Sequence, residues 1–454
     1  MTRSILIVCL LSLATNTAQA SQPNILFILI DDLGWMDLAC QGNKLVSTPN
    51  MDRLAKQGMR FTNAYAAAPV CSPTRAAILT GKSPARLQIT NHIPDRKQFT
   101  PKNAKLKSAY MRNFLPLSEV TIAERLQKSG YRTGFFGKWH LSGGGRGRKE
   151  LNPDRQGFDI NIGGCGYGGP PTFFDPYRIP TIKNRQKGEY LPDRLADEAI
   201  QFIQKKDKRP FLLFLWNYTV HWPMEAPNAM LKKYVKYKGQ RGRGLNDYRY
   251  GAMIEAMDAA VGRVIDELEK QQIADETLVI FYSDNGGFAG VSDNKPLRAA
   301  KGHLYEGGIR VPLIVRWPGK VEAGTLCHEP VISMDFYATL AETAGIKLQT
   351  SPPDGESIMP LLKQTGKLKR KEIYFHYPNY AWHRSNRLGS AVRSGRYKLI
   401  ERFDDGTLEL FDLQSDLSEK RNLAKRMPQL ASRLRAKLDK WRKASGAAIP
   451  VATR

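Results

Sequence analysis

Cysteine is scarce in this chain, which has five cysteines in 454 residues, and no two of them form a C-x-x-C pair. Without that spacing the sequence supports neither a zinc ribbon nor a thioredoxin-type redox site. Cys9 lies in an apolar N-terminal segment, and the remainder of the chain contains Cys40, Cys71, Cys165 and Cys327. The sequence alone does not say whether any of these four pair.

A hydrophobic run long enough to cross a membrane is also missing. The apolar run Ile5–Leu13 is much shorter than the roughly 20 residues that a spanning helix needs. Arg3 precedes it and Ala18-Gln19-Ala20 follows it, which is the pattern of a cleavable secretory signal peptide over residues 1–20. We therefore expect a mature chain that starts near Ser21, is secreted or periplasmic, and has no membrane attachment.

Acidic residues are few compared with basic ones: 43 Asp and Glu stand against 69 Lys and Arg, a formal net charge of +26. A surface this basic implies an acidic partner. Nucleic acid is disfavoured because no zinc-finger, KH or RRM pattern is present and the basic residues are scattered along the chain. A polyanionic glycan fits this composition better.

Short apolar runs alternate with amphipathic helical segments through most of the chain, which predicts an α/β fold with a large, mostly parallel or mixed sheet flanked by helices. The predicted strands are 23–30, 131–136, 211–217, 277–283 and 313–317. A Pro/Gly- and lysine-rich stretch then indicates a boundary. We expect a catalytic domain over residues 21–365 and a smaller α+β domain over residues 366–454.

Polar and charged clusters follow these predicted strands. Asp31, Asp32, Asp284 and Asn285 offer hard oxygen ligands without histidine or cysteine, a set that suits Ca²⁺ or Mg²⁺ and disfavours zinc. Cations and proton-transfer groups occupy the other clusters: Lys138, His140, His221 and Lys301. A divalent metal beside several cations is suited to stabilising the charge of an ester oxyanion.

The segment CSPTRAAILTG, residues 71–81, reads as a cysteine at the start of a short helix that Gly81 ends. Helix N-termini attract anions, and Arg75 lies one turn along with a guanidinium suited to a tetrahedral oxyanion. Taken alone, a cysteine in such a position is more often a small buried hydrophobic residue.

The full string C-x-P-[ST]-R followed by L-T-G resembles the signature of the type I sulfatases, arylsulfatase-like members of the alkaline phosphatase superfamily. The resemblance implies that a formylglycine-generating maturation enzyme oxidises Cys71, so that the nucleophile is an aldehyde hydrate. It also implies Ca²⁺ held by Asp31, Asp32, Asp284, Asn285 and the formylglycine at position 71. With Cys71 converted, three cysteines remain and at most one disulfide can form.

The same resemblance implies roles for the cationic residues. Arg75, Lys138 and Lys301 would surround the sulfate, His221 would protonate the leaving alcohol, and His140 would remove a proton to release sulfate. A polar sulfate-contacting residue that some members carry has no counterpart in the glycine-rich loop 163–169. Basic and aromatic surroundings make four further residues candidates for substrate contact: His92, His376, His383 and Arg384.

The sequence therefore predicts a sulfatase that acts on a sulfated carbohydrate. A phosphonate or phosphodiester hydrolase of the same superfamily could use the same metal, formylglycine and cations. A non-catalytic polyanion-binding protein would also explain the charge, although it would give no reason for a complete set of proton-transfer groups.

We predict that Cys71 is converted to formylglycine when the protein is made in a host that has the maturation enzyme. Mass spectrometry of the tryptic peptide Phe61–Arg75 tests this, with Cys71→Ala as an inactive but folded control. Fully active protein that carries only the unmodified thiol would contradict the proposed nucleophile.

Overall fold

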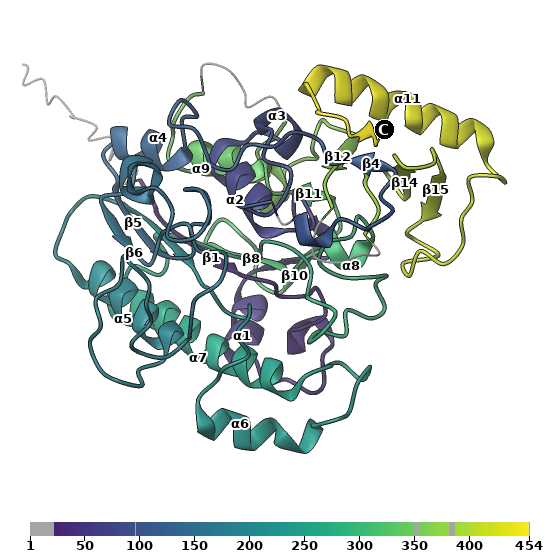
Figure 1. Ribbon diagram of the computed structural model, residues 1–454. Helices are drawn as coiled ribbons and strands as arrows, with labels where there is room; N and C mark the ends of the chain where they lie inside the picture. The colour runs from purple at the N-terminus through teal and green to yellow at the C-terminus, as the bar shows by residue number, and fades with distance from the viewer. Residues whose placement is uncertain (1–21, 96, 349–353, 381–385, 454) are drawn as a thin grey trace, which may run out of the picture.

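The computed structural model describes residues 22–95, 97–348, 354–380 and 386–453. The predicted signal peptide lies outside these ranges, as do the candidate substrate contacts His383 and Arg384. A mixed eight-stranded sheet runs through the centre of the molecule (Figure 1). Its strands, in spatial order, are β10 (Thr325–Cys327), β2 (Met59–Phe61), β9 (Leu313–Arg316), β8 (Thr277–Ser283), β1 (Asn24–Ile30), β7 (Phe211–Trp216), β5 (Arg132–Gly137) and β6 (Ile160–Ile162).

Most neighbouring strands of this sheet are parallel. β1 pairs in parallel with both β7 and β8, and β5 pairs in parallel with β7 and β6. β9 is antiparallel to β8 and to β2. The carboxyl ends of β1, β5, β7 and β8 therefore meet at one edge, and β9 starts at that same edge.

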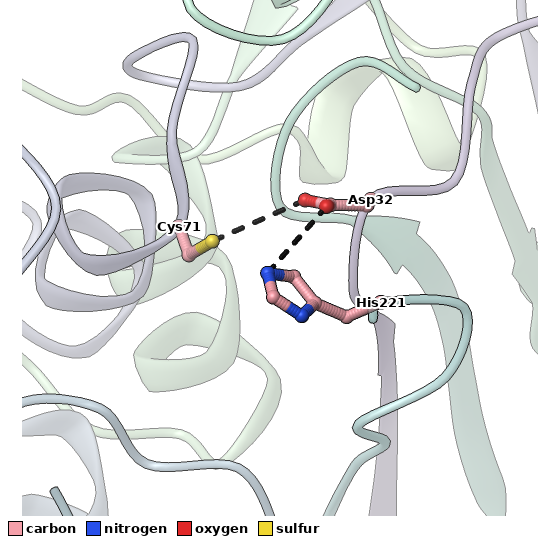
Figure 2. Close-up of side chains that lie close together, drawn as sticks. All are labelled: Asp32, Cys71 and His221. Carbon is pink, nitrogen blue, oxygen red and sulfur yellow. Dashed lines mark hydrogen bonds and ion pairs between the residues drawn. The ribbon is translucent and has the colours of Figure 1, made fainter. Parts of the chain in front are cut away.

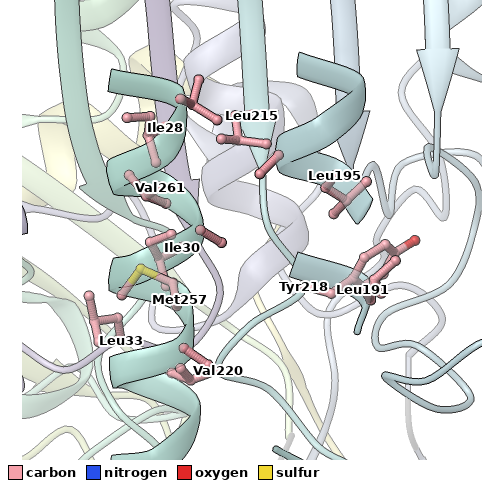
Figure 3. Packing of buried hydrophobic residues seen from close by; sticks show 14 of the residues in the cluster. Ile28, Ile30, Leu33, Leu191, Leu195, Leu215, Tyr218, Val220, Met257 and Val261 are labelled. Atoms are coloured by element: carbon pink, nitrogen blue, oxygen red, sulfur yellow. The ribbon is translucent and has the colours of Figure 1, made fainter. Parts of the chain in front are cut away.

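Helices cover both faces of the sheet (Figure 1). Leu26, Ile28 and Ile30 of β1 pack toward a layer that contains α1 (Pro49–Gln57), α5 (Leu191–Gln204) and α7 (Tyr248–Lys270). Figure 3 shows Ile28 and Ile30 next to Met257 and Val261 of α7. The alternate residues of β1 pack toward α2 (Cys71–Thr80), α4 (Ile122–Lys128) and α9 (Asp335–Thr343). Burial of both faces explains why this strand is an unbroken apolar run.

A second, four-stranded antiparallel sheet follows the central sheet in the chain: β12 (Glu372–Tyr377), β13 (Gly389–Ser394), β14 (Tyr397–Arg402) and β15 (Leu408–Asp412). One of its faces packs under α11 (Pro428–Ser445), and the other contacts residues around α2 and α8 (Glu306–Ile309). The predicted fold class, a large mixed sheet flanked by helices with a smaller C-terminal domain, is confirmed. The boundary at residues 365 and 366 stays a prediction.

The remaining helices and strands are short. They are β3 (Ala64–Tyr65), α3 (Pro84–Leu87), β4 (Leu106–Lys107), α6 (Asn228–Tyr234), β11 (Val331–Ile332), α10 (Met359–Leu362) and β16 (Val451–Ala452). Within the described ranges, no helix is both long and apolar enough to span a bilayer. Cys40, Cys71, Cys165 and Cys327 are free thiols in the described structure.

Candidate active site

Three carboxylates and a thiol converge at the carboxyl edge of the central sheet, where β1 and β8 end. Ligand atoms of Asp31, Asp32, Asp284 and Cys71 all lie within 4.8 Å of one another. The Asp32 amide donates to Asp284 Oδ1 at 3.2 Å, and Asn285 Nδ2 donates to Asp32 Oδ1 at 2.8 Å. The structure thus brings together the predicted ligand set, because paired parallel strands end side by side.

Three buried cations face these three carboxylates. Lys138 Nζ lies 2.6 Å from Asp31 Oδ2, and Lys301 Nζ lies 2.6 and 2.7 Å from the two oxygens of Asp32. Arg75 donates to Asp284 Oδ2 from Nε at 2.9 Å and from Nη2 at 2.6 Å. Each of the six side chains is at most 4% exposed. A buried ion is costly unless it is paired, and here the formal charges cancel.

The two aspartates that end β1 differ in proton affinity. Burial raises the pKa of Asp31, whereas Lys138, whose Nζ lies 2.6 Å from Asp31 Oδ2, opposes the shift and favours the charged carboxylate. Burial acts on Asp32 in the same direction, but Lys301 and His221 outweigh it, so the pKa of Asp32 lies well below its usual range. Asp32 is therefore the carboxylate that the surrounding cations hold most firmly in its charged form.

Cys71 is the first residue of α2 and is fully buried. Its Sγ lies 3.5 Å from Lys301 Nζ. It also lies 4.0 Å from Asp32 Oδ1, the contact drawn in Figure 2. Burial raises the pKa of the Cys71 thiol to about 12, although Lys138 and Lys301 oppose the shift. The unmodified residue therefore remains a protonated thiol near neutral pH, and a thiol is a much weaker nucleophile than a thiolate.

His221 follows β7 and points at the same centre. Figure 2 shows its ring and the Cys71 thiol both directed at the Asp32 carboxylate, with His221 Nε2 at 3.7 Å from Asp32 Oδ2. His221 Nδ1 lies 3.0 Å from the Trp222 carbonyl oxygen, which can only accept, so Nδ1 carries a proton. Burial and the charge of Lys301 lower the pKa of His221 to about 3.

His140 lies behind Cys71 and has contacts that the sequence did not predict. Its Nε2 donates to the Ile93 carbonyl at 2.5 Å, which leaves Nδ1 as the basic nitrogen, 3.1 Å from Ser72 Oγ. Ser72 Oγ also accepts a hydrogen bond from the Ile93 amide at 3.2 Å. Burial, reinforced by His92, Lys138 and Arg75, lowers the pKa of His140 well below its usual value. Ser72 is therefore a further candidate for a functional role. In the sequence, the only sign of such a role is its position next to Cys71.

The glycine-rich loop closes the histidine side of the site. A Cβ added to Gly168 would lie 2.6 Å from His140 Nε2 and 2.7 Å from His92 Nε2. A Cβ added to Gly169 would lie 2.7 Å from His221 Nδ1. The loop backbone therefore passes directly against three histidine rings, and a side chain at either position would displace them.

The structure places two of the candidate substrate-contact residues, His92 and His376, in different parts of the molecule. His92 is buried with its ring centroid 4.3 Å from that of His140, so it lies beside the site. The structure does not support the proposed role of His376, which lies in β12 and not in a loop. Its Nδ1 lies 2.7 Å from Ser390 Oγ and its Nε2 lies 2.9 Å from the Ala448 carbonyl oxygen. His376 therefore helps to hold α11 and the C-terminal segment on the small sheet.

The described residues fit a hard divalent cation. Asp31 Oδ1 and Asn285 Oδ1 are buried acceptors for which no hydrogen-bond partner is found in the described ranges. Arg75 Nη2 approaches Asp31 Oδ1 only to 3.8 Å. Oxygen-only donor sets of this kind suit Ca²⁺ or Mg²⁺, and a bound cation would satisfy both orphaned oxygens.

Comparison with known proteins gives a consistent result. A family model described as Sulfatase matches residues 23–346, and one described as N-sulphoglucosamine sulphohydrolase, C-terminal, matches residues 299–444. A protein named sulfatase from Formosa agariphila is 32% identical over 96% of this chain and 92% of its own length. Human arylsulfatase A is 34% identical over 86% of this chain and 76% of its own length.

A solved structure is similar over nearly the whole chain. The crystal structure of Ps i-CgsB in complex with k-i-k-neocarrahexaose superposes with a TM-score of 0.79 at 30% sequence identity. The match covers 93% of each chain.

We predict that Ser72→Ala lowers the free energy of unfolding by about 1–3 kcal/mol, because it leaves His140 Nδ1 and the Ile93 amide without a buried partner. Activity should fall as well, because His140 loses its fixed ring position. Ser142→Ala is the matched control: Ser142 is also buried, and its Oγ has no hydrogen-bond partner among the described residues. Urea denaturation of both variants measures the difference, and equal losses would contradict the assigned contact.

Proposed function

This chain belongs to the sulfatase family and is a sulfuric ester hydrolase, and we propose that it hydrolyses sulfate esters on a sulfated carbohydrate. We further propose that formylglycine derived from Cys71 is the nucleophile, that Ca²⁺ is the metal, and that the mature enzyme is secreted or periplasmic. The observation that carries the proposal is the buried, charge-balanced cluster around Cys71.

The state of Cys71 supports conversion to formylglycine. A thiol with a pKa of about 12, buried at the start of α2, supplies almost no thiolate at neutral pH. When formed, the aldehyde hydrate supplies an oxygen nucleophile at this position. Lys301 Nζ is 3.5 Å from the present Sγ and is therefore placed to hydrogen-bond to a group at position 71.

The oxygen donors support a bound Ca²⁺, which would be held by Asp31, Asp32, Asp284, Asn285 and the modified residue 71. When bound, Ca²⁺ would polarise an ester oxygen and favour the charge that develops on it. Arg75 and Lys138 line the same space and contribute fixed positive charge for a sulfate group.

In His221 and His140, one ring nitrogen bonds to a backbone carbonyl, so the other nitrogen is the one that would transfer a proton. His221 presents Nε2 to the centre because Nδ1 is bound to the Trp222 carbonyl, so Nε2 is the atom that would pass a proton to the leaving alcohol. An anionic ester beside this ring would oppose the effect of Lys301 and favour the protonated imidazole. His140 presents Nδ1, next to Ser72 Oγ, as the atom that would accept a proton during sulfate release.

The carbohydrate substrate is supported by charge and by similarity. A chain with net charge +26 attracts polyanions over a long range. The similar structure Ps i-CgsB is in complex with an oligosaccharide, k-i-k-neocarrahexaose. A small aryl sulfate would gain little from the long-range field beyond the attraction of its single sulfate.

We predict that Asp31→Ala and Asp284→Ala lose bound Ca²⁺ and most activity, because fewer carboxylates hold a hard cation more weakly. Elemental analysis of the purified proteins measures the metal. Asp258→Asn is the control, since Asp258 is equally buried but binds Asn50 and the Met51 amide away from the site. Stoichiometric zinc without calcium would contradict the proposed ligand set.

We predict that sulfated oligosaccharides have a higher kcat/KM than a synthetic aryl sulfate, and that the advantage shrinks as salt is added. A panel of defined sulfated oligosaccharides, an aryl sulfate and a phosphonate ester, assayed at low and moderate ionic strength, tests the proposed function. Rapid turnover of the phosphonate ester with every glycan inert would favour the phosphonate hydrolase and overturn the carbohydrate assignment.

A further inference from the structure

A large basic cavity lies between the catalytic core and the C-terminal sheet, apart from the residues of the active site. Its volume is about 1050 Å³, at the upper end of the range for ligand-binding pockets. The lining includes six Lys and Arg side chains but only two carboxylates, Glu329 and Glu372. None of the predicted metal ligands or catalytic residues lines it.

Arg393 places an uncompensated charge in the lining of this cavity. It is 7% exposed, and its hydrogen-bond partners are neutral: the Gly395 carbonyl and Asn63 Oδ1, each at 3.1 Å, and the Tyr65 hydroxyl. No ion pair is found for it in the described part of the chain. A buried cation without a carboxylate is costly, so an anion in the cavity would be favoured.

Glu306 interacts with Arg393 through its charge, but it is already paired with other cations. Lys398 bonds to both Glu306 and Glu419, and Arg310 lies 3.3 Å from Glu306. Arg393 therefore has no carboxylate partner of its own among the described residues. Arg310 and Arg393 are the members of this group that line the cavity.

Exposed cations stand around the opening. Lys367 and Lys371 line the cavity, are exposed, and form no ion pair in the ranges that the structure describes. Arg396 has a 45% exposed side chain, although it is paired with Asp412. Next to it, Tyr397 is partly exposed, and the Arg396 guanidinium lies over its ring, 5.7 Å from the centroid.

A second, smaller cavity continues the first along the underside of α11. Its volume is about 360 Å³, and it shares Ser394 and Tyr397 with the larger one. Arg433 and Lys437 add positive charge to its lining, and Lys437 is paired with Glu372. The two cavities together form a basic groove that is longer than a single small anion requires.

We propose that this groove, lined by Lys367, Lys371, Arg393 and Tyr397, is a second anion-binding site that holds a sulfated stretch of a glycan chain away from the catalytic centre. The preference for an anion follows from the groove itself, whereas the choice of a glycan rests on the proposed function. Such a site would keep a polymeric substrate on the enzyme while one of its esters is in the active site.

The test compares two double variants that lower the net charge equally. Lys367→Gln with Lys371→Gln removes the two exposed cations at the groove, and Lys205→Gln with Lys206→Gln removes two exposed lysines after α5. Each pair is made in the full chain and in a Cys71→Ala background, where glycan binding can be measured without turnover. Defined heparin oligosaccharides are the probe, with inorganic sulfate and single-stranded DNA as comparison ligands.

The groove variant should bind the longer heparin oligosaccharides about tenfold more weakly, with a shallower salt dependence, whereas the control should change less than twofold. Turnover of an aryl sulfate should be unchanged in both. Equal losses in the two variants would overturn the proposed site, and tighter binding of DNA with the same dependence on Lys367 and Lys371 would overturn the glycan assignment. Groove-dependent binding, together with a wild-type protein that hydrolyses none of the sulfated glycans, would instead refute only the proposed function.

Discussion

The mutual neutralisation of three buried carboxylates and three buried cations is the constraint on which the rest of this structure depends. Asp31, Asp32 and Asp284 could not be buried together without Lys138, Lys301 and Arg75, and those cations could not be buried without the carboxylates. Asp31 Oδ1 accepts no hydrogen bond from the described residues, and neither does Asn285 Oδ1 beside the six groups. These two oxygens are those that a hard cation would take.

This constraint explains the direction of the strands. β1, β5, β7 and β8 are parallel, so Asp31, Lys138, His221 and Asp284 all leave the sheet at the same edge. Lys301 has to reach Asp32 from the segment that precedes β9. An antiparallel β9 starts where β8 ends, so the chain between them can remain at the active-site edge without crossing the sheet. The reversed direction of β9 therefore keeps Lys301 beside Asp32.

The parts of the site that depend on local pattern could be predicted from the sequence. Apolar runs predicted five of the eight strands of the central sheet to within about a residue, but not the short edge strands β6 and β10 or β2. The polar residues that follow the predicted strands are those that meet at the edge of the sheet. The contacts of Ser72 with His140 and Ile93 could not be predicted, because they join segments with no shared periodicity. The surroundings of His376 could not be predicted for the same reason: its basic and aromatic neighbours in sequence do not show that it contacts Ala448 and Trp441 of the C-terminal segment.

The C-terminal sheet is linked to catalysis by charge as well as by packing. Glu306 begins α8, shortly after Lys301, and it is held by Lys398 of β14 at 3.0 Å and by the Tyr65 hydroxyl at 2.7 Å. Its amide donates to Glu419, whose pKa burial raises to about 7. The segment that carries Lys301 is therefore anchored to the small sheet by buried ions, which tolerate little displacement because separating them exposes each charge to an apolar interior. Since Arg310 and Arg393 belong to the same group of charges, one network anchors the segment that carries Lys301 on one side and lines the basic groove on the other.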